Sequence, residues 1–121
     1  MTQQKIFEAY QSLYKLSKQE LPIREAWNIA KQLDQLRPFW QFQRDEECKF
    51  LETHEHNLID GGILFKCAED KEAFEKRVDD IFALDQDVEI KPFKLALSDD
   101  IKLTAQDVKT LQGDFVEFVE G

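Results

Sequence analysis

The chain has 121 residues, a formal net charge of −9 and a hydrophobic fraction of 42%. This composition excludes a disordered tail, because it supplies enough apolar side chains for a core, and the length fits a single domain over residues 1–121. The acidic balance argues against nucleic acid and membranes as partners, since phosphate backbones and anionic lipids repel a negatively charged surface.

The distribution of apolar and cysteine residues predicts where the protein resides. The chain has no run of about 18 apolar residues, so we expect no transmembrane helix. Its first residues lack the apolar stretch of a secretory signal. The two cysteines in such a chain are typical of free thiols in a reducing compartment, so we expect a cytoplasmic protein.

Two helices are predicted in the first half of the chain. Apolar residues recur at three- and four-residue steps from Ile6 to Leu16, which predicts a helix over residues 4–18. Pro22 suits the first turn of a second helix, which extends to about His54. The main apolar stripe of this long helix consists of Ala26, Ile29, Ala30, Leu33, Leu36, Trp40 and Leu51.

Pro38 stands inside the long helix, where it removes one hydrogen bond and kinks the axis. No glycine or turn cluster accompanies it, so we expect the helix to continue through the kink. Several large aromatic residues lie off the main stripe and are candidates for a protein interface: Trp27, Phe39, Phe42 and Phe50. The alternative is that the rest of the chain folds over these residues and makes them part of the core.

The middle of the chain alternates between turn, strand and helix signals. NLIDGG, residues 57–62, has the composition of a turn, and the apolar run at residues 63–67 predicts a strand. Residues 69–84 predict a third helix, with Phe74 and Ile81 on its apolar side.

The last third of the chain predicts one more strand and one more helix. Residues 87–97 alternate as a strand that Pro92 confines to a sheet edge. Thr104 is a good N-cap with Asp107 three residues on, and Gly113 ends the short helix that follows. We expect the apolar tail after Gly113 to pack onto the body of the protein.

These elements predict an α+β domain that is mainly α. The long kinked helix pairs with the helix at residues 4–18 as an antiparallel helical hairpin. A small β-sheet made of residues 63–67 and 87–97 packs with the helix at 69–84 and with the C-terminal helix at one end.

Both cysteines and both histidines lie within twenty residues: Cys48, His54, His56 and Cys67. Structural zinc sites usually pair their ligands within one tight turn or one helical turn, which this spacing does not do. Two residues apart, the histidines point to opposite sides of a helix. We therefore expect no metal ion and no cofactor.

Catalytic motifs are also missing from the sequence. There is no phosphate-binding loop, no dinucleotide-binding glycine pattern and no serine nucleophile elbow. Acidic runs such as Asp45-Glu46-Glu47 are interpreted as solvated helix faces, because neighbouring residues on a helix point about 100° apart. We expect no enzyme and assign no catalytic residues. A third class of function, a small enzyme without known motifs, requires a pocket with convergent polar groups.

The order of several segments is similar to a known family. The similarity rests on three segments in this order: LPIREAWNIAKQLDQL, EAFEKRVDDIFALDQDVEIKPFKLAL and IKLTAQDVKTLQGDFVEF. This order resembles a family of small uncharacterised proteins of Gram-positive bacteria and their phages, described only as a domain of unknown function. The resemblance implies a phage or prophage origin and a role in virion assembly, and it supplies no catalytic or ligand residues.

The sequence thus favours a non-enzymatic protein-binding or assembly component that associates with itself. The alternative is an acidic inhibitor or immunity-type protein, a nucleic-acid mimic that blocks a basic enzyme. An inhibitor should bind through its acidic face in a salt-sensitive way, whereas an assembly protein should bind through apolar side chains.

Overall fold

The computed structural model describes residues 1–120 of the chain. Within these residues it contains four helices and two separate two-stranded sheets, which confirms the predicted α+β, mainly α class. The elements are α1 (Gln3–Ser17), α2 (Ile23–Glu52), β1 (His56–Ile59), β2 (Gly62–Phe65), α3 (Ala68–Phe82), β3 (Phe93–Leu97), α4 (Ala105–Leu111) and β4 (Val116–Glu120).

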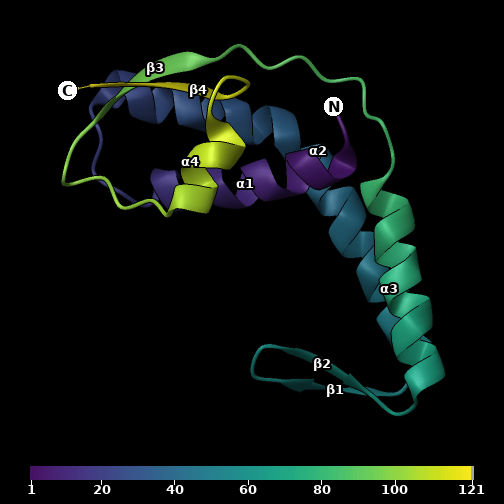
Figure 1. Ribbon diagram of the computed structural model, residues 1–121. Helices are drawn as coiled ribbons and strands as arrows, with labels where there is room; N and C mark the ends of the chain where they lie inside the picture. The colour runs from purple at the N-terminus through teal and green to yellow at the C-terminus, as the bar shows by residue number, and fades with distance from the viewer. Residues whose placement is uncertain (121) are drawn as a thin grey trace.

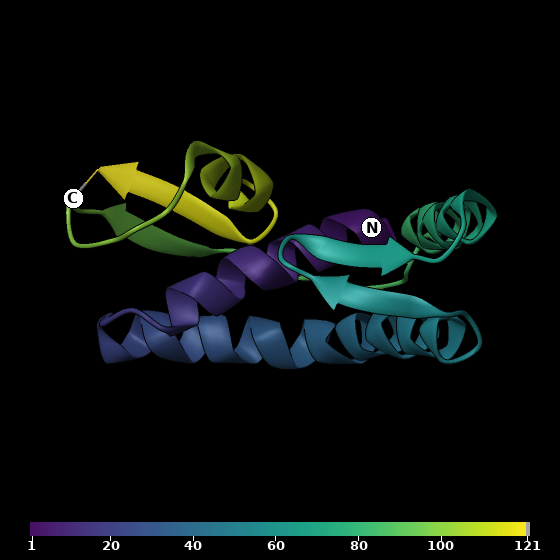
Figure 2. The same ribbon diagram turned by 90° about the horizontal axis from the view of Figure 1, so that it is seen from below.

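The long helix α2 is the frame of the molecule. Figure 2 shows it running the length of the protein, with α4 and the β3–β4 pair at one end and α3 at the other. It continues without interruption through Pro38, as predicted. Figure 1 shows that α2 follows α1 over its first half and turns toward α3 over its second half. A proline inside a helix accounts for such a change of direction.

The bend divides the protein into two regions, the body and the arm. The body comprises residues 1–42 and 83–120, and it contains α1, the first half of α2, α4 and the β3–β4 pair. The arm comprises residues 43–82, with the second half of α2, the β1–β2 hairpin and α3.

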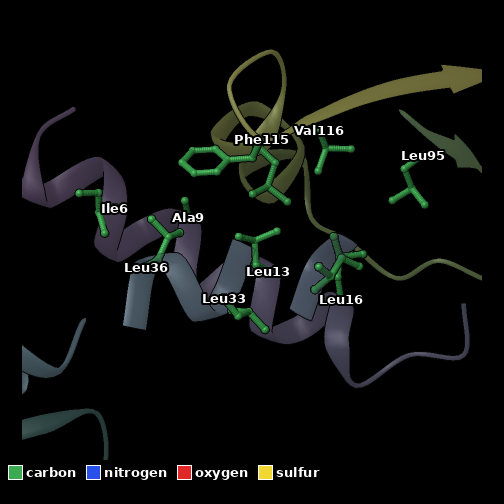
Figure 3. Packing of buried hydrophobic residues seen from close by; sticks show 11 residues of the cluster. Ile6, Ala9, Leu13, Leu16, Leu33, Leu36, Leu95, Phe115 and Val116 are labelled. Atoms are coloured by element: carbon green, nitrogen blue, oxygen red, sulfur yellow. The ribbon is translucent and has the colours of Figure 1, made fainter. Parts of the chain in front are cut away.

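The hydrophobic core lies in the body. The apolar faces of α1 and α2 meet there because Ile6, Leu13, Leu33 and Leu36 recur at helical spacing and are all buried. Figure 3 shows Phe115 and side chains of the β3–β4 pair closing this core from the side of α4. The core cluster consists of Ile6, Ala9, Leu13, Leu16, Ile29, Leu33, Leu36, Leu95, Leu111, Phe115 and Val116.

The predicted single sheet is wrong. The strand near residues 63–67 pairs antiparallel with β1 in the arm, whereas β3 pairs in parallel with β4 in the body. The tail after Gly113 is therefore a strand, and it pairs with β3 in place of the predicted partner at residues 63–67. Correspondingly, α3 and α4 do not gather at one end, because α3 belongs to the arm and α4 to the body.

The predicted strand over residues 87–97 is also shorter than expected, since only Phe93–Leu97 pairs with another strand. Residues 87–92 are extended but are held by side chains of α2 instead of a neighbouring strand. Gln32 Nε2 donates to the Lys91 carbonyl at 3.1 Å, and Gln35 Nε2 donates to the Glu89 carbonyl at 3.2 Å. These two side-chain amides replace hydrogen bonds to a neighbouring strand. Pro92 cannot donate such a hydrogen bond, because proline has no N–H.

Candidate protein-interaction surface

The β1–β2 hairpin is built from two short apolar segments around an Asp-Gly turn. Gly61 has φ 86°, a backbone conformation that residues with a side chain rarely adopt. Glycine at this position therefore permits the tight reversal after Asp60. The register pairs Leu58 with Ile63, and Ile59 with Gly62. The predicted turn therefore lies at the tip of a hairpin whose second strand is the predicted apolar run.

An aromatic cluster attaches the base of the hairpin to the two helices of the arm. The ring of Phe74 in α3 lies 5.4 Å from that of Phe50 in α2 and 5.3 Å from that of Phe65 in β2. The imidazole of His54 stacks on Phe50 at 3.8 Å between ring centroids. These rings are only half-buried, so the arm has an aromatic contact zone in place of a closed core.

An ion pair beside this cluster ties the two arm helices together. Glu46 accepts hydrogen bonds from Arg77 of α3 at 2.6 Å and from Lys49 of its own helix at 3.1 Å. The hydrogen bond from Lys49, followed by that from Arg77, lowers the pKa of the Glu46 carboxyl. The exposed setting of Arg77 means that solvent screens this pair, so it orients α3 more than it stabilises it.

The far part of the hairpin leaves three aliphatic side chains uncovered. The exposed fraction is 77% for Leu58, 51% for Ile59 and 55% for Leu64. Because successive residues of a strand point to opposite faces, Leu58 lies on one face of the hairpin and Ile59 and Leu64 on the other. These three residues are called the hairpin surface below, and they make the ribbon apolar on both faces.

The four candidate interface residues fall into two groups. Phe39 packs against the core and Phe50 belongs to the aromatic cluster of the arm, so other parts of the chain cover both rings in part. Trp27 and Phe42 are exposed to 63% and 40%. The sequence grouped these residues because they lie off one stripe of α2, but the kink presents each half of the helix to different neighbours.

Sequence reasoning did not assign the hairpin surface to any site. The available signal was the pair of apolar dipeptides, Leu58-Ile59 and Ile63-Leu64, on either side of the Asp-Gly-Gly turn. A hairpin with two apolar residues in succession on each strand has no polar face, and this pattern could have identified the surface.

The histidine rings of the arm make local hydrogen bonds, whereas its cysteine thiols make none within residues 1–120. Cys48 and Cys67 are free and exposed. Nδ1 of His54 lies 2.7 Å from the Phe50 carbonyl oxygen, and Nδ1 of His56 lies 2.8 Å from the His54 carbonyl oxygen, so each ring completes a local turn. Across residues 1–120, no three His, Cys, Asp or Glu side chains are grouped closely enough to hold a metal ion.

A groove of about 910 Å³ lies between α1 and α4 in the body, with Tyr10, Tyr14 and Trp40 among its lining residues. Trp40 is stacked between two rings of α1, at 4.7 Å from both Phe7 and Tyr10. Two of its three aromatic lining residues, Tyr10 and Trp40, are thus already engaged in packing α2 against α1, whereas Tyr14 is exposed.

A polar cluster at the edge of this groove resembles a catalytic arrangement but has a structural role. Ser12 Oγ donates to Asp107 at 2.8 Å, and Lys15 Nζ donates to the same carboxylate at 3.1 Å. Asp107 also completes the capping box of α4 with Thr104. Ser12 is buried and donates its proton to a carboxylate, with no nitrogen base against its oxygen, so it lacks the activation that a serine nucleophile needs.

These contacts favour the charged form of Asp107. Burial by itself would raise the pKa of its carboxyl, but the hydrogen bonds from Ser12, Thr104 and Lys15 outweigh burial, so the pKa is lowered. The cluster therefore joins α4 to α1 through a stable carboxylate.

The chain was compared with family models, with curated proteins and with solved structures, and none of them matches it. The resemblance to the phage and bacterial domain of unknown function therefore stays a prediction. No helix within residues 1–120 combines the length and the apolar character that crossing a membrane requires.

Proposed function

We propose that this protein is a non-enzymatic binding and assembly component that associates with copies of itself, with the hairpin surface as its contact. The observation that carries the proposal is the exposure of Leu58, Ile59 and Leu64 on a hairpin that projects from the end of the arm. Large aliphatic side chains gathered on one projection are typical of a surface that a partner covers.

The energetics of the hairpin support this proposal. An isolated two-stranded hairpin is at best marginally stable in water, and only the base of this one contacts the aromatic cluster. Complete burial of a leucine or isoleucine side chain contributes roughly 1.5–3 kcal/mol, so a partner that covered the hairpin surface would also stabilise the hairpin itself. Its strands carry few of the charges with which proteins usually protect exposed edges.

The proposal extends to the compartment and the origin of the protein. Free thiols at Cys48 and Cys67 accord with a reducing cytoplasm. A phage or prophage origin, as the resemblance implies, would fit a small protein that assembles through a surface instead of acting on a substrate.

Sedimentation velocity tests the proposal over about a hundred-fold range of protein concentration. We expect the average mass of the wild-type protein to rise with concentration. The double variant Leu58→Asp with Leu64→Asp should stay a monomer, because two buried carboxylates would oppose association. Leu97→Asp is the matched control, since Leu97 is exposed to a similar extent on β3, at the other end of the molecule.

A wild-type protein that is monomeric at every concentration would refute self-association. Association that is equally weakened by the control and by the hairpin variant would show that general surface apolarity, and not the hairpin surface, drives it. Circular dichroism of each variant should match the wild type, because the substituted side chains are exposed.

A further inference from the structure

A second uncovered apolar region lies at the start of α2. Ile23 is 86% exposed and Trp27, one helical turn later, is 63% exposed. Arg24 and Lys31 lie on the same side of the helix, because residues three and four apart are neighbours on a helix surface. These four residues are called the helix-start patch.

Three cationic side chains in or beside this patch are unpaired within residues 1–120, although Glu25 also lies in the first turn of α2. Arg24, Lys31 and the nearby Lys91 take part in no ion pair within the part of the chain that the structure describes. Lys31 and Lys91 both line a hollow of about 290 Å³ between α2 and the segment that leads into β3. The patch thus combines a tryptophan, an isoleucine and a concave rim of cations, in a protein whose net charge is −9.

The hairpin surface has the complementary chemistry. Asp60 lies at the turn directly after Leu58 and Ile59, it is exposed, and it too has no ion-pair partner within residues 1–120. Glu52, at the end of α2 where the chain leaves for the hairpin, is another exposed carboxylate without a partner there. The hairpin surface thus combines aliphatic side chains with carboxylates, whereas the helix-start patch combines aliphatic and aromatic side chains with cations.

The two surfaces cannot meet within one chain. Trp27 and Glu52 are 25 residues apart on α2, which corresponds to roughly 37 Å along the helix at about 1.5 Å per residue. The four-residue strands of the hairpin extend only about 14 Å from its base. Figure 2 shows the start of α2 at the end of the molecule opposite α3, near which the hairpin begins.

We propose that the hairpin surface of one copy binds the helix-start patch of a second copy, with Asp60 placed against Lys31 and Lys91. This inference rests on the proposed function and adds the receiving surface to it. The two surfaces differ, so the contact is heterologous and every bound copy still offers one free surface of each kind. Assembly is then head to tail, and it produces an open chain or a closed ring.

Two variants that are each defective at one surface test the inference. The hairpin variant carries Leu58→Asp and Leu64→Asp, and the patch variant carries Ile23→Ser and Trp27→Ser. Each should sediment as a monomer when it is alone. An equimolar mixture should contain a species of twice the monomer mass and nothing larger, because only one intact hairpin and one intact patch can meet.

Charge reversal provides the second arm of the experiment. Asp60→Lys and Lys31→Glu should each weaken wild-type association and should reduce its dependence on salt. The double variant with both reversals should regain much of the lost association, which nonspecific apolar contact would not do. Tyr14→Ser serves as the control, because Tyr14 is an exposed aromatic residue that lines the groove instead of the patch.

Three results would overturn the inference. A patch variant that associates alone, like the wild type, would show that hairpins pair with each other, and the proposed function would survive. Loss of association in Tyr14→Ser, but not in the patch variant, would assign the groove as the receiving surface. A monomeric wild-type protein would remove both the inference and the self-association on which it rests.

Discussion

The body and the arm are stabilised in different ways. The body encloses eleven buried apolar residues, most of them aliphatic, in one cluster between α1, α2 and α4. In the arm only Gln43 and Ile81 are buried, and both lie close to the joint with the body. The rest of the arm is held by half-buried rings around Phe50 and by the ion pair between Arg77 and Glu46.

This difference indicates a division of roles. A region with a closed core keeps its shape without help, whereas a region with few buried contacts opens more easily and gains the most from a bound partner. Three exposed aliphatic side chains, Leu58, Ile59 and Leu64, lie together on the weakly packed arm. The body provides the fixed frame. The single helix α2 runs from the body into the arm and so determines where the hairpin lies.

The largest effect should come from emptying the core of the body. Phe115 is completely buried and its carbonyl accepts a hydrogen bond from Gln32 at 2.8 Å. Phe115→Ala should lower the free energy of unfolding by about 3–5 kcal/mol, because it removes apolar contacts and leaves a cavity. Urea unfolding followed by circular dichroism measures this loss. Phe42→Ala, at an exposed ring of the body, should cost less than about 1 kcal/mol, and an equal loss at both positions would contradict the role of Phe115 as a core residue.

A smaller effect is expected at the polar cluster that joins α4 to α1. Asp107→Ala should lower the free energy of unfolding by about 2 kcal/mol, since it removes a helix cap and leaves the Ser12 hydroxyl without its acceptor. Asp99→Ala, at an exposed position in the loop before α4, should have little effect. Thermal unfolding at neutral pH compares the two variants.

The pH dependence of this contribution follows from the lowered pKa of Asp107 in the folded state. A carboxyl with a depressed folded pKa stabilises the protein above its unfolded pKa, and the contribution is lost as the pH falls through the folded pKa. The difference in unfolding free energy between wild type and Asp107→Ala should therefore be largest near neutral pH and should shrink below about pH 4. A difference that grew on acidification would mean that the carboxyl is destabilising in its charged form.

The smallest and most local effect should appear in the arm. Phe74→Ala removes the ring between Phe50 and Phe65, and it should cost about 1–2 kcal/mol, confined to the arm. Hydrogen exchange should become faster at residues 56–65 while the amides of α1 keep their protection. Glu72→Ala, an exposed substitution in the same helix, is the control. Faster exchange throughout the body would show that the two regions unfold as one unit.

Much of the local structure could be predicted because it depends on short-range chemistry. The helical spacing from Ile6 to Leu16 gave the first helix, and the Thr104 and Asp107 pair gave the N-terminus of α4, where both capping hydrogen bonds are present. The absence of a turn signal around Pro38 correctly predicted a continuous α2. Each of these features is decided by residues within one or two turns of each other.

The strand pairing could not be predicted in this way. The two predicted strands are both present in part, but each pairs with a segment that has no distinctive pairing signal of its own: β1 lies directly before the turn, and β4 is the tail after Gly113. A strand specifies its own alternation of side chains, whereas its partner depends on which segments the helices bring together. For the same reason, the sequence could not separate the covered Phe50 from the exposed Trp27.

The sequence by itself determined the class of the fold, the extent of the helices and the acidic character of the protein, because these follow from composition, periodicity and capping. Only the tertiary structure decided which apolar residues are left without a cover. That outcome depends on the direction in which α2 leaves the body after Pro38, and on the contacts of Phe74 that carry the hairpin away from the core. Burial is a property of neighbours that are distant in sequence, so the exposure of the hairpin surface and of the helix-start patch was decided only when the chain folded.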